Sequence, residues 1–185
     1  MVSVKQSAKG NDNVQIIGSN NVVAGSVLVM SEIQPLTHSL VHELLDVVYS
    51  QPSPKSSDYS LRNPAQIHEK LRFNNATKYI SIIDNHSDDY VRVGDVMKDY
   101  PNSEDIVKRL RDMFLDVVDN FDDNGNPCVG DGNAQLDSIK EKLVRMIIAD
   151  ANFNADNHVS EQIDQFCIAL IAYGISKCKI LETPV

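Results

Sequence analysis

The sequence predicts a mainly α-helical protein, a helical bundle that carries a short N-terminal β-repeat segment. Apolar residues recur at helical spacing through most of the chain after residue 30. Residues 1–30 instead combine β-branched residues with Asn and Gly, which is typical of short strands joined by tight turns. The length of 185 residues fits one domain with a small appendage. We therefore divide the chain into an Asn/Gly-rich β-repeat segment, residues 1–30, and a helical domain, residues 31–185.

Residues 10–25 form an eight-residue repeat, GNDNVQII followed by GSNNVVAG. A solenoid needs about three or more such units, and two short strands are only marginally stable alone. A partner must therefore cover the aliphatic side chains of the repeat, which are Val14, Ile16, Ile17, Val22 and Val23. The same segment of a second copy, or a sheet edge of another chain, would supply that partner. The alternative is a disordered tail, since Asn, Gly and Ser dominate the segment.

The helical domain follows in pieces. The first helix starts near Pro35 and places Leu36, Leu40, Leu44 and Val48 on one face. The stretch QPSPKSSD, residues 51–58, has the composition of a linker. Asn63 and Pro64 then suit the cap and the first position of the next helix. We expect the later helices over residues 63–72, 76–84, 91–100, 102–118, 134–149 and 158–178.

The loop NFDDNGNPCVGD, residues 120–131, imitates a calcium-binding EF-hand because Gly125 stands at its sixth position. However, the loop begins with Asn120, has Pro127 at its eighth position and ends with Asp131 in place of a bidentate Glu. The sequence therefore favours a solvated loop between two helices over a calcium site.

His38 and His42 stand four residues apart, so both imidazoles would lie on one helix face. A zinc-protease helix has Glu directly after its first His, and this chain has Ser39 there. We therefore interpret the two histidines as an exposed polar stripe and predict no metal or other cofactor. The sequence also contains neither GxSxG nor GxxxxGK[ST], and the glycines of residues 10–25 do not open a helix as those of a phosphate loop do. No catalytic residues are predicted, and we expect no enzymatic activity.

Composition and charge limit the kinds of partner that the chain can bind and the cellular compartment in which we expect it. The net charge of −9 disfavours direct binding to nucleic acid. The longest apolar run, CIALIAYGI, has nine residues and is too short to span a membrane. The N-terminus lacks the apolar stretch of a signal peptide. The three cysteines form no CxxC pair, so we expect a reduced, cytoplasmic protein.

A basic surface on two helices keeps one alternative open. Its residues are Lys108, Arg109, Arg111, Lys140, Lys142 and Arg145. Basic residues that alternate with acids at helical spacing usually form exposed ion pairs. If they were free instead, the chain would suit a DNA-binding regulator of the phage or plasmid type.

Two short motifs resemble a known family. The segment PAQIHEKLRFNN, residues 64–75, follows the pattern P-x-x-I-x-x-K-[LI]-x-[FY]-N, with matches at Pro64, Ile67, Lys70, Leu71, Phe73 and Asn74. The ending ISKCKILETP supplies a second match at Cys178, Lys179, Ile180, Leu181 and Glu182. Both resemble C-terminal assembly modules of bacterial ABC three-component, or Lamassu-type, antiphage defence systems. An Asn/Gly-rich repeat often precedes such modules.

This resemblance implies a complex with an SMC/Rad50-like ATPase and an effector, often a nuclease. Effector chains carry a catalytic domain before the module, and residues 1–30 are too short for one. The expected role is therefore a non-catalytic accessory subunit that docks partner chains and contacts nucleic acid only through them. Residues 10–25 would join copies of the chain or different chains.

Overall fold

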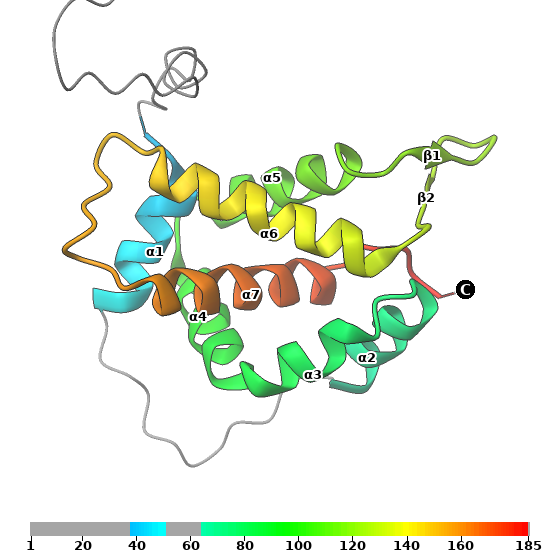
Figure 1. Ribbon diagram of the computed structural model, residues 1–185, viewed down its shortest axis with the longest axis horizontal. Coiled ribbons are helices and arrows are strands. Elements are labelled where there is room, and N and C mark those ends of the chain that lie inside the picture. The colour runs from blue at the N-terminus through cyan, green and yellow to red at the C-terminus, as the bar shows by residue number, and fades with distance from the viewer. Residues whose placement is uncertain (1–37, 51–63, 185) are drawn as a thin grey trace, which may run out of the picture. The chain divides into compact units, whose positions relative to one another are not determined.

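Figure 1 presents the computed structural model, which describes residues 38–50 and 64–184. Several predictions made from the sequence lie outside these residues. They are the repeat with Val14, Ile16, Ile17, Val22 and Val23, the linker of residues 51–58, and the proposed cap Asn63.

The described residues are mainly helical, as predicted from the apolar spacing. The helices are α1 (Leu40–Ser50), α2 (Pro64–Phe73), α3 (Lys78–Asn85), α4 (Ser87–Asp99), α5 (Ser103–Leu115), α6 (Gly132–Ile148) and α7 (Ser160–Ser176). A two-stranded antiparallel hairpin, β1 (Asn120–Phe121) and β2 (Pro127–Cys128), projects between α5 and α6.

Helix α7 is the centre of the bundle. In Figure 1, α5 and α6 lie on one side of it and α2, α3 and α4 on the other, and α7 contacts all five. Its buried residues occur on every side of the helix, which is the pattern of a helix surrounded by other elements. Helix α1 packs against α4 and α6. The two ends of the bundle therefore bring together segments that are far apart in the sequence.

Most of the predicted helices are confirmed within a few residues, but α1 begins at Leu40, five residues after the predicted start near Pro35, and α4 begins at Ser87, four residues earlier than its apolar spacing indicated. The added turn contains Asp88 and Asp89, whose negative charges are favourable at a helix N-terminus. Because this first turn is polar, apolar periodicity does not predict it. Among residues 38–50 and 64–184, none of the helices is both long enough and apolar enough to cross a membrane.

The loop that imitates an EF-hand forms the hairpin. One carboxylate oxygen of Asp122 accepts hydrogen bonds from the backbone N–H groups of Asn124 and Asn126 at 2.9 and 2.7 Å. Its other oxygen accepts from the Asn126 amide at 2.9 Å. Gly125 takes a φ of 78°, which Gly adopts readily. The prediction of an exposed loop was right for residues 119–126, whereas the short ladder was missed because two-residue strands leave no periodic signal.

Candidate functional site

The two motifs of the family resemblance meet at one end of the bundle. Lys70 and Asn74 lie one helical turn apart at the end of α2, so their side chains point to the same side. Both are buried, and both bond to the backbone of the segment that follows α7. We call this arrangement of Lys70, Asn74 and residues 175–182 the C-terminal clamp.

Lys70 joins two points of the clamp. Its ammonium donates hydrogen bonds to the carbonyl oxygens of Ile175 at 3.1 Å and Ile180 at 3.3 Å. Burial lowers the pKa of Lys70 below its ordinary value of 10.5, although the nearby Cys178 side chain opposes that shift. Lys70 is only 5% exposed, so if its ammonium were removed, water would not readily replace the two hydrogen bonds that it donates to these carbonyls.

Asn74 forms hydrogen bonds both with α2 and with the C-terminal segment. Its amide nitrogen donates to the carbonyl of Lys70 at 2.7 Å and to that of Glu182 at 2.9 Å. Its amide oxygen accepts the backbone N–H of Glu182 at 2.8 Å. The Asn74 amide thus forms with the Glu182 backbone the pair of hydrogen bonds that a residue of a neighbouring β-strand would form.

The start of α6 and the loop before it also form hydrogen bonds with the C-terminal clamp. The N–H of Gly132 donates to the carbonyl of Asn74 at 3.1 Å, and the Glu182 carboxylate accepts the N–H of Val129. A Cβ atom on Gly132 would lie 2.1 Å from the Asn74 carbonyl oxygen, so this approach requires glycine. The C-terminal clamp therefore connects α2, the loop before α6 and the end of α7.

The chain makes a tight turn to enter the clamp. Cys178 and Leu181 adopt positive φ angles of 55° and 67°, which are unfavourable for residues with a Cβ atom. Each such conformation costs about 1–3 kcal/mol and persists where the surroundings hold it. Here the hydrogen bonds of Lys70 and Asn74, together with the burial of Ile180, hold the turn.

Most of the motif residues are either buried or exposed, and Glu182 is partly buried. Buried residues are Ile67, Lys70, Leu71, Asn74, Ile180 and Leu181. Exposed residues are Phe73, Cys178 and Lys179, and Phe73 is 51% exposed. Pro64 is the first residue of α2, as the sequence predicted. The signal for the clamp was the pair of polar residues four apart beside Ile67 and Leu71, but only the fold identifies their partner.

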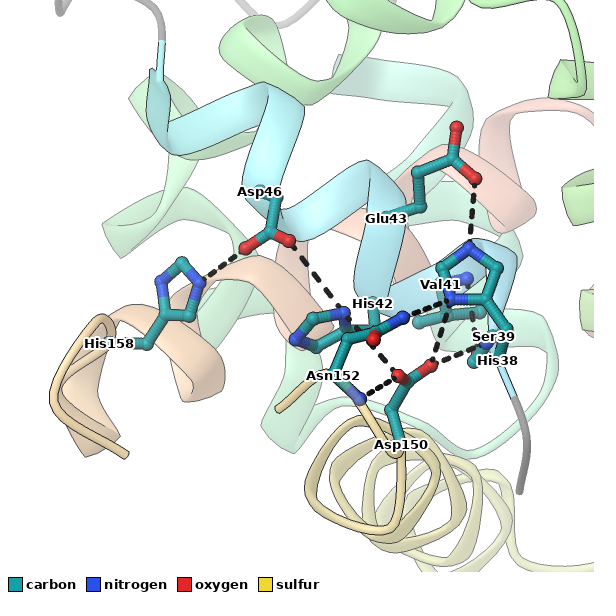
Figure 2. Close-up of polar contacts among 9 residues, drawn as sticks. All are labelled: His38, Ser39, Val41, His42, Glu43, Asp46, Asp150, Asn152 and His158. Carbon is teal, nitrogen blue, oxygen red and sulfur yellow. Dashed lines mark hydrogen bonds and ion pairs between the residues drawn. The ribbon is translucent and has the colours of Figure 1, made fainter. Parts of the chain in front are cut away.

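A second group of polar side chains lies at the opposite end of α7, where α1 meets the loop between α6 and α7 (Figure 2). We call His42, Asp46, Asp150 and His158 the histidine–aspartate cluster. His158 Nε2 lies 2.7 Å from Asp46 Oδ1, and His42 Nδ1 lies 3.7 Å from Asp46 Oδ2. Asp150 is completely buried, with Oδ1 3.9 Å from His42 Nδ1.

The prediction of an exposed stripe of His38 and His42 was right about the exposure of His38 and wrong for His42. His42 is buried, because α1 turns this face toward α6 and the following loop. His38 precedes α1, is half-exposed, and contacts Glu43 and Asn152 instead. His158, which lies more than a hundred residues further along the chain, was not predicted from the sequence.

Comparison of the chain with protein-family models, with curated proteins and with solved structures finds no match.

Proposed function

We propose that this chain is a non-catalytic accessory subunit of a bacterial antiphage defence complex, in which it docks an SMC/Rad50-like ATPase and an effector. The observation that carries the proposal is the C-terminal clamp. The motifs at residues 64–75 and 175–184 are far apart in the sequence, yet Lys70 and Asn74 of the first bond directly to Ile180 and Glu182 of the second. Their co-occurrence therefore has a physical reason, since each motif stabilises the other.

Phe73 is the proposed docking contact of this module. It belongs to the α2 motif, between the clamp residues Lys70 and Asn74, but its ring is half-exposed. An exposed aromatic residue on a rigid element can anchor an interface, because its large apolar surface is buried on binding with little loss of side-chain entropy. The buried motif residues stabilise the C-terminal clamp, whereas the exposed Phe73 contacts the partner.

Co-purification from the native operon tests the proposal. The tagged chain should recover a long coiled-coil ATPase and an effector encoded beside it. Phe73→Asp should reduce this recovery by about tenfold or more, since a buried aromatic anchor contributes about 2 kcal/mol or more to binding.

Phe121 offers a matched control. It is 50% exposed, nearly the same as Phe73, but it lies in the hairpin between α5 and α6. Phe121→Asp should leave partner recovery unchanged. A wild-type chain that emerges alone, or equal losses in the two variants, would contradict docking through α2.

The alternative of a DNA-binding regulator has less support. Four basic residues of the candidate surface form ion pairs with acids, namely Lys108 with Asp105, Lys140 with Asp164, Lys142 with Asp116 and Arg145 with Glu141. These acids reduce the local positive potential that attraction of a phosphate backbone needs. Retention of the purified chain on duplex DNA at low salt, lost as salt rises, would favour the regulator instead.

The joining of chains through residues 10–25 is the second part of the proposal. Deletion of residues 1–30 should lower the oligomeric state, measured by light scattering, while circular dichroism of the helical domain stays unchanged. An oligomeric state that is the same with and without these residues would exclude this role.

A further inference from the structure

The histidine–aspartate cluster contains a set of donor atoms that neither the docking role nor the C-terminal clamp uses. His42, Asp46 and His158 each offer one atom, and these three atoms lie within 4.8 Å of one another (Figure 2). Two imidazole nitrogens and a carboxylate oxygen are ligands that Zn²⁺ and related divalent ions take in proteins. We propose that these three residues bind one divalent transition-metal ion of the Zn²⁺ class.

The spacing of the donors suits such an ion. Two ligand atoms bound tetrahedrally to zinc are about 3.3–3.5 Å apart, given bond lengths of about 2.0–2.2 Å. His42 Nδ1 is 3.7 Å from Asp46 Oδ2, close to that separation. His158 Nε2 is 2.7 Å from Asp46 Oδ1, which is the length of a hydrogen bond. Metal binding would replace that hydrogen bond, and the two atoms would move apart by about 0.6 Å to reach the ligand separation.

A buried nitrogen without a hydrogen-bond partner points to a ligand. The His42 side chain is 3% exposed, and its Nδ1 atom has no hydrogen bond although it faces Asp46 and Asp150. A buried polar atom in this state has lost its hydrogen bonds to water without gaining others in the protein. Coordination to a metal ion would satisfy it, because neutral imidazole binds metal through the nitrogen lone pair.

The surrounding charges also favour a cation. Asp46 and Asp150 place two carboxylates beside His42. Asp150 is held by the N–H groups of Ser39 and Asn152, so its charge is fixed in position. The ring of Phe153 lies edge-on to His42, and the ring of Tyr49 lies edge-on to His158.

Solvent still reaches one side of the cluster. The side chain of Asp46 is 51% exposed, which leaves room for a water molecule as the fourth ligand. His158 lies in the loop before α7, and His42 and Asp46 lie on α1. A bound ion would therefore cross-link α1 to the segment that enters the central helix. This inference does not depend on the proposed docking function.

Metal titration of the full chain tests the site. The protein is freed of metal with a chelator, dialysed, and titrated with Co²⁺ followed by absorption and with Zn²⁺ followed by calorimetry. We expect one tight site that gives the visible spectrum of tetrahedral cobalt and that zinc displaces. Asp46→Asn and His158→Asn should each weaken binding at least about tenfold, since the first removes the charge of the carboxylate ligand and the second removes an imidazole ligand.

His68 is the matched control. Its Nε2 atom also lies 2.7 Å from an aspartate, Asp84, but that pair is on the surface between α2 and α3. His68→Asn should bind Co²⁺ as the wild type does. Asp46→Asn keeps the size of a half-exposed side chain, so it still decides the matter if His158→Asn fails to fold.

Two results would overturn the inference. One is a wild-type chain that binds neither Co²⁺ nor Zn²⁺ at micromolar concentration. The other is binding of equal strength in the wild type and the Asp46→Asn variant, which would place the ion elsewhere in the chain.

Discussion

The amide side chain of Asn74 and the backbone of Glu182 form two hydrogen bonds with each other, one in each direction, at 2.9 and 2.8 Å. This pairing attaches the end of α2 to the C-terminal segment. Because Asn74 is only 1% exposed, water cannot replace either bond in the folded protein. The stability of the bundle should therefore be sensitive to this one side chain.

Asn74→Ala should lower the free energy of unfolding by about 2–4 kcal/mol, measured by urea denaturation. The substitution removes three side-chain hydrogen bonds and leaves the backbone N–H and carbonyl of Glu182 without the partner that the Asn74 amide supplies, while the Lys70 carbonyl keeps the backbone N–H of residue 74. The exposed Asn157→Ala is the control and should change stability by less than about 0.5 kcal/mol. Equal stability of the two variants would show that the pairing contributes little.

Gly132→Ala and Gly94→Ala should have opposite effects. A Cβ atom on Gly132 would collide with the Asn74 carbonyl oxygen, so we expect a loss of about 1–3 kcal/mol or more as α6 moves away from α2. Gly94 lies within α4 with no atom within 4 Å of an added Cβ. Alanine there should raise stability by about 0.5–1 kcal/mol. A stabilising Gly132→Ala, measured in the same denaturation experiment, would contradict the close approach at the clamp.

Lys70 should make the protein more stable at alkaline pH. Its folded-state pKa lies below the unfolded value, so the unfolded chain binds more protons between those two pKa values. The stability of the wild type relative to Lys70→Met should therefore rise as the pH increases from neutral toward about 10.5.

Chemical denaturation of both proteins at several pH values measures that difference, in a Cys178→Ser background that removes the influence of the neighbouring thiol on Lys70. Lys108→Met, which removes the ammonium of an exposed lysine, serves as the control. A wild-type advantage that falls with rising pH would mean that the ammonium is stabilised by its surroundings.

Asp137 should contribute to acid sensitivity. Burial acts to raise the pKa of Asp137, but hydrogen bonds from the Lys78 ammonium and the Tyr79 hydroxyl outweigh it and hold the pKa below 3.8. Its stabilising effect is thus present above about pH 3.8 and is lost as the pH falls through the lower, folded-state pKa.

Asp137→Asn should cost about 1 kcal/mol or less at neutral pH, since the Asp137 side chain is partly exposed, and the cost should vanish in acid. Thermal unfolding as a function of pH measures this convergence. Asp105→Asn, which alters a more exposed ion pair with Lys108, is the control. A cost that persists at the lowest pH would assign the effect to packing instead of charge.

The helical class and most helix positions could be predicted from the sequence because apolar spacing is a local property. The segments at 64–73 and 160–176 are examples, where periodicity or apolar content alone indicates a helix. The burial of His42 could not be predicted from apolar spacing. Its position on α1 is local, but the face that α1 buries depends on where α4 and α6 lie.

Local sequence patterns account for the mainly helical chain, its two family-like motifs and the polar residues available to them. Which of those residues contact one another depends on how the helices pack. Asn74 reaches Glu182 across 108 positions, and His158 reaches Asp46 across 112. Such pairs form when helices pack around α7, and that packing reflects the burial of the whole core, which no single stretch of sequence specifies.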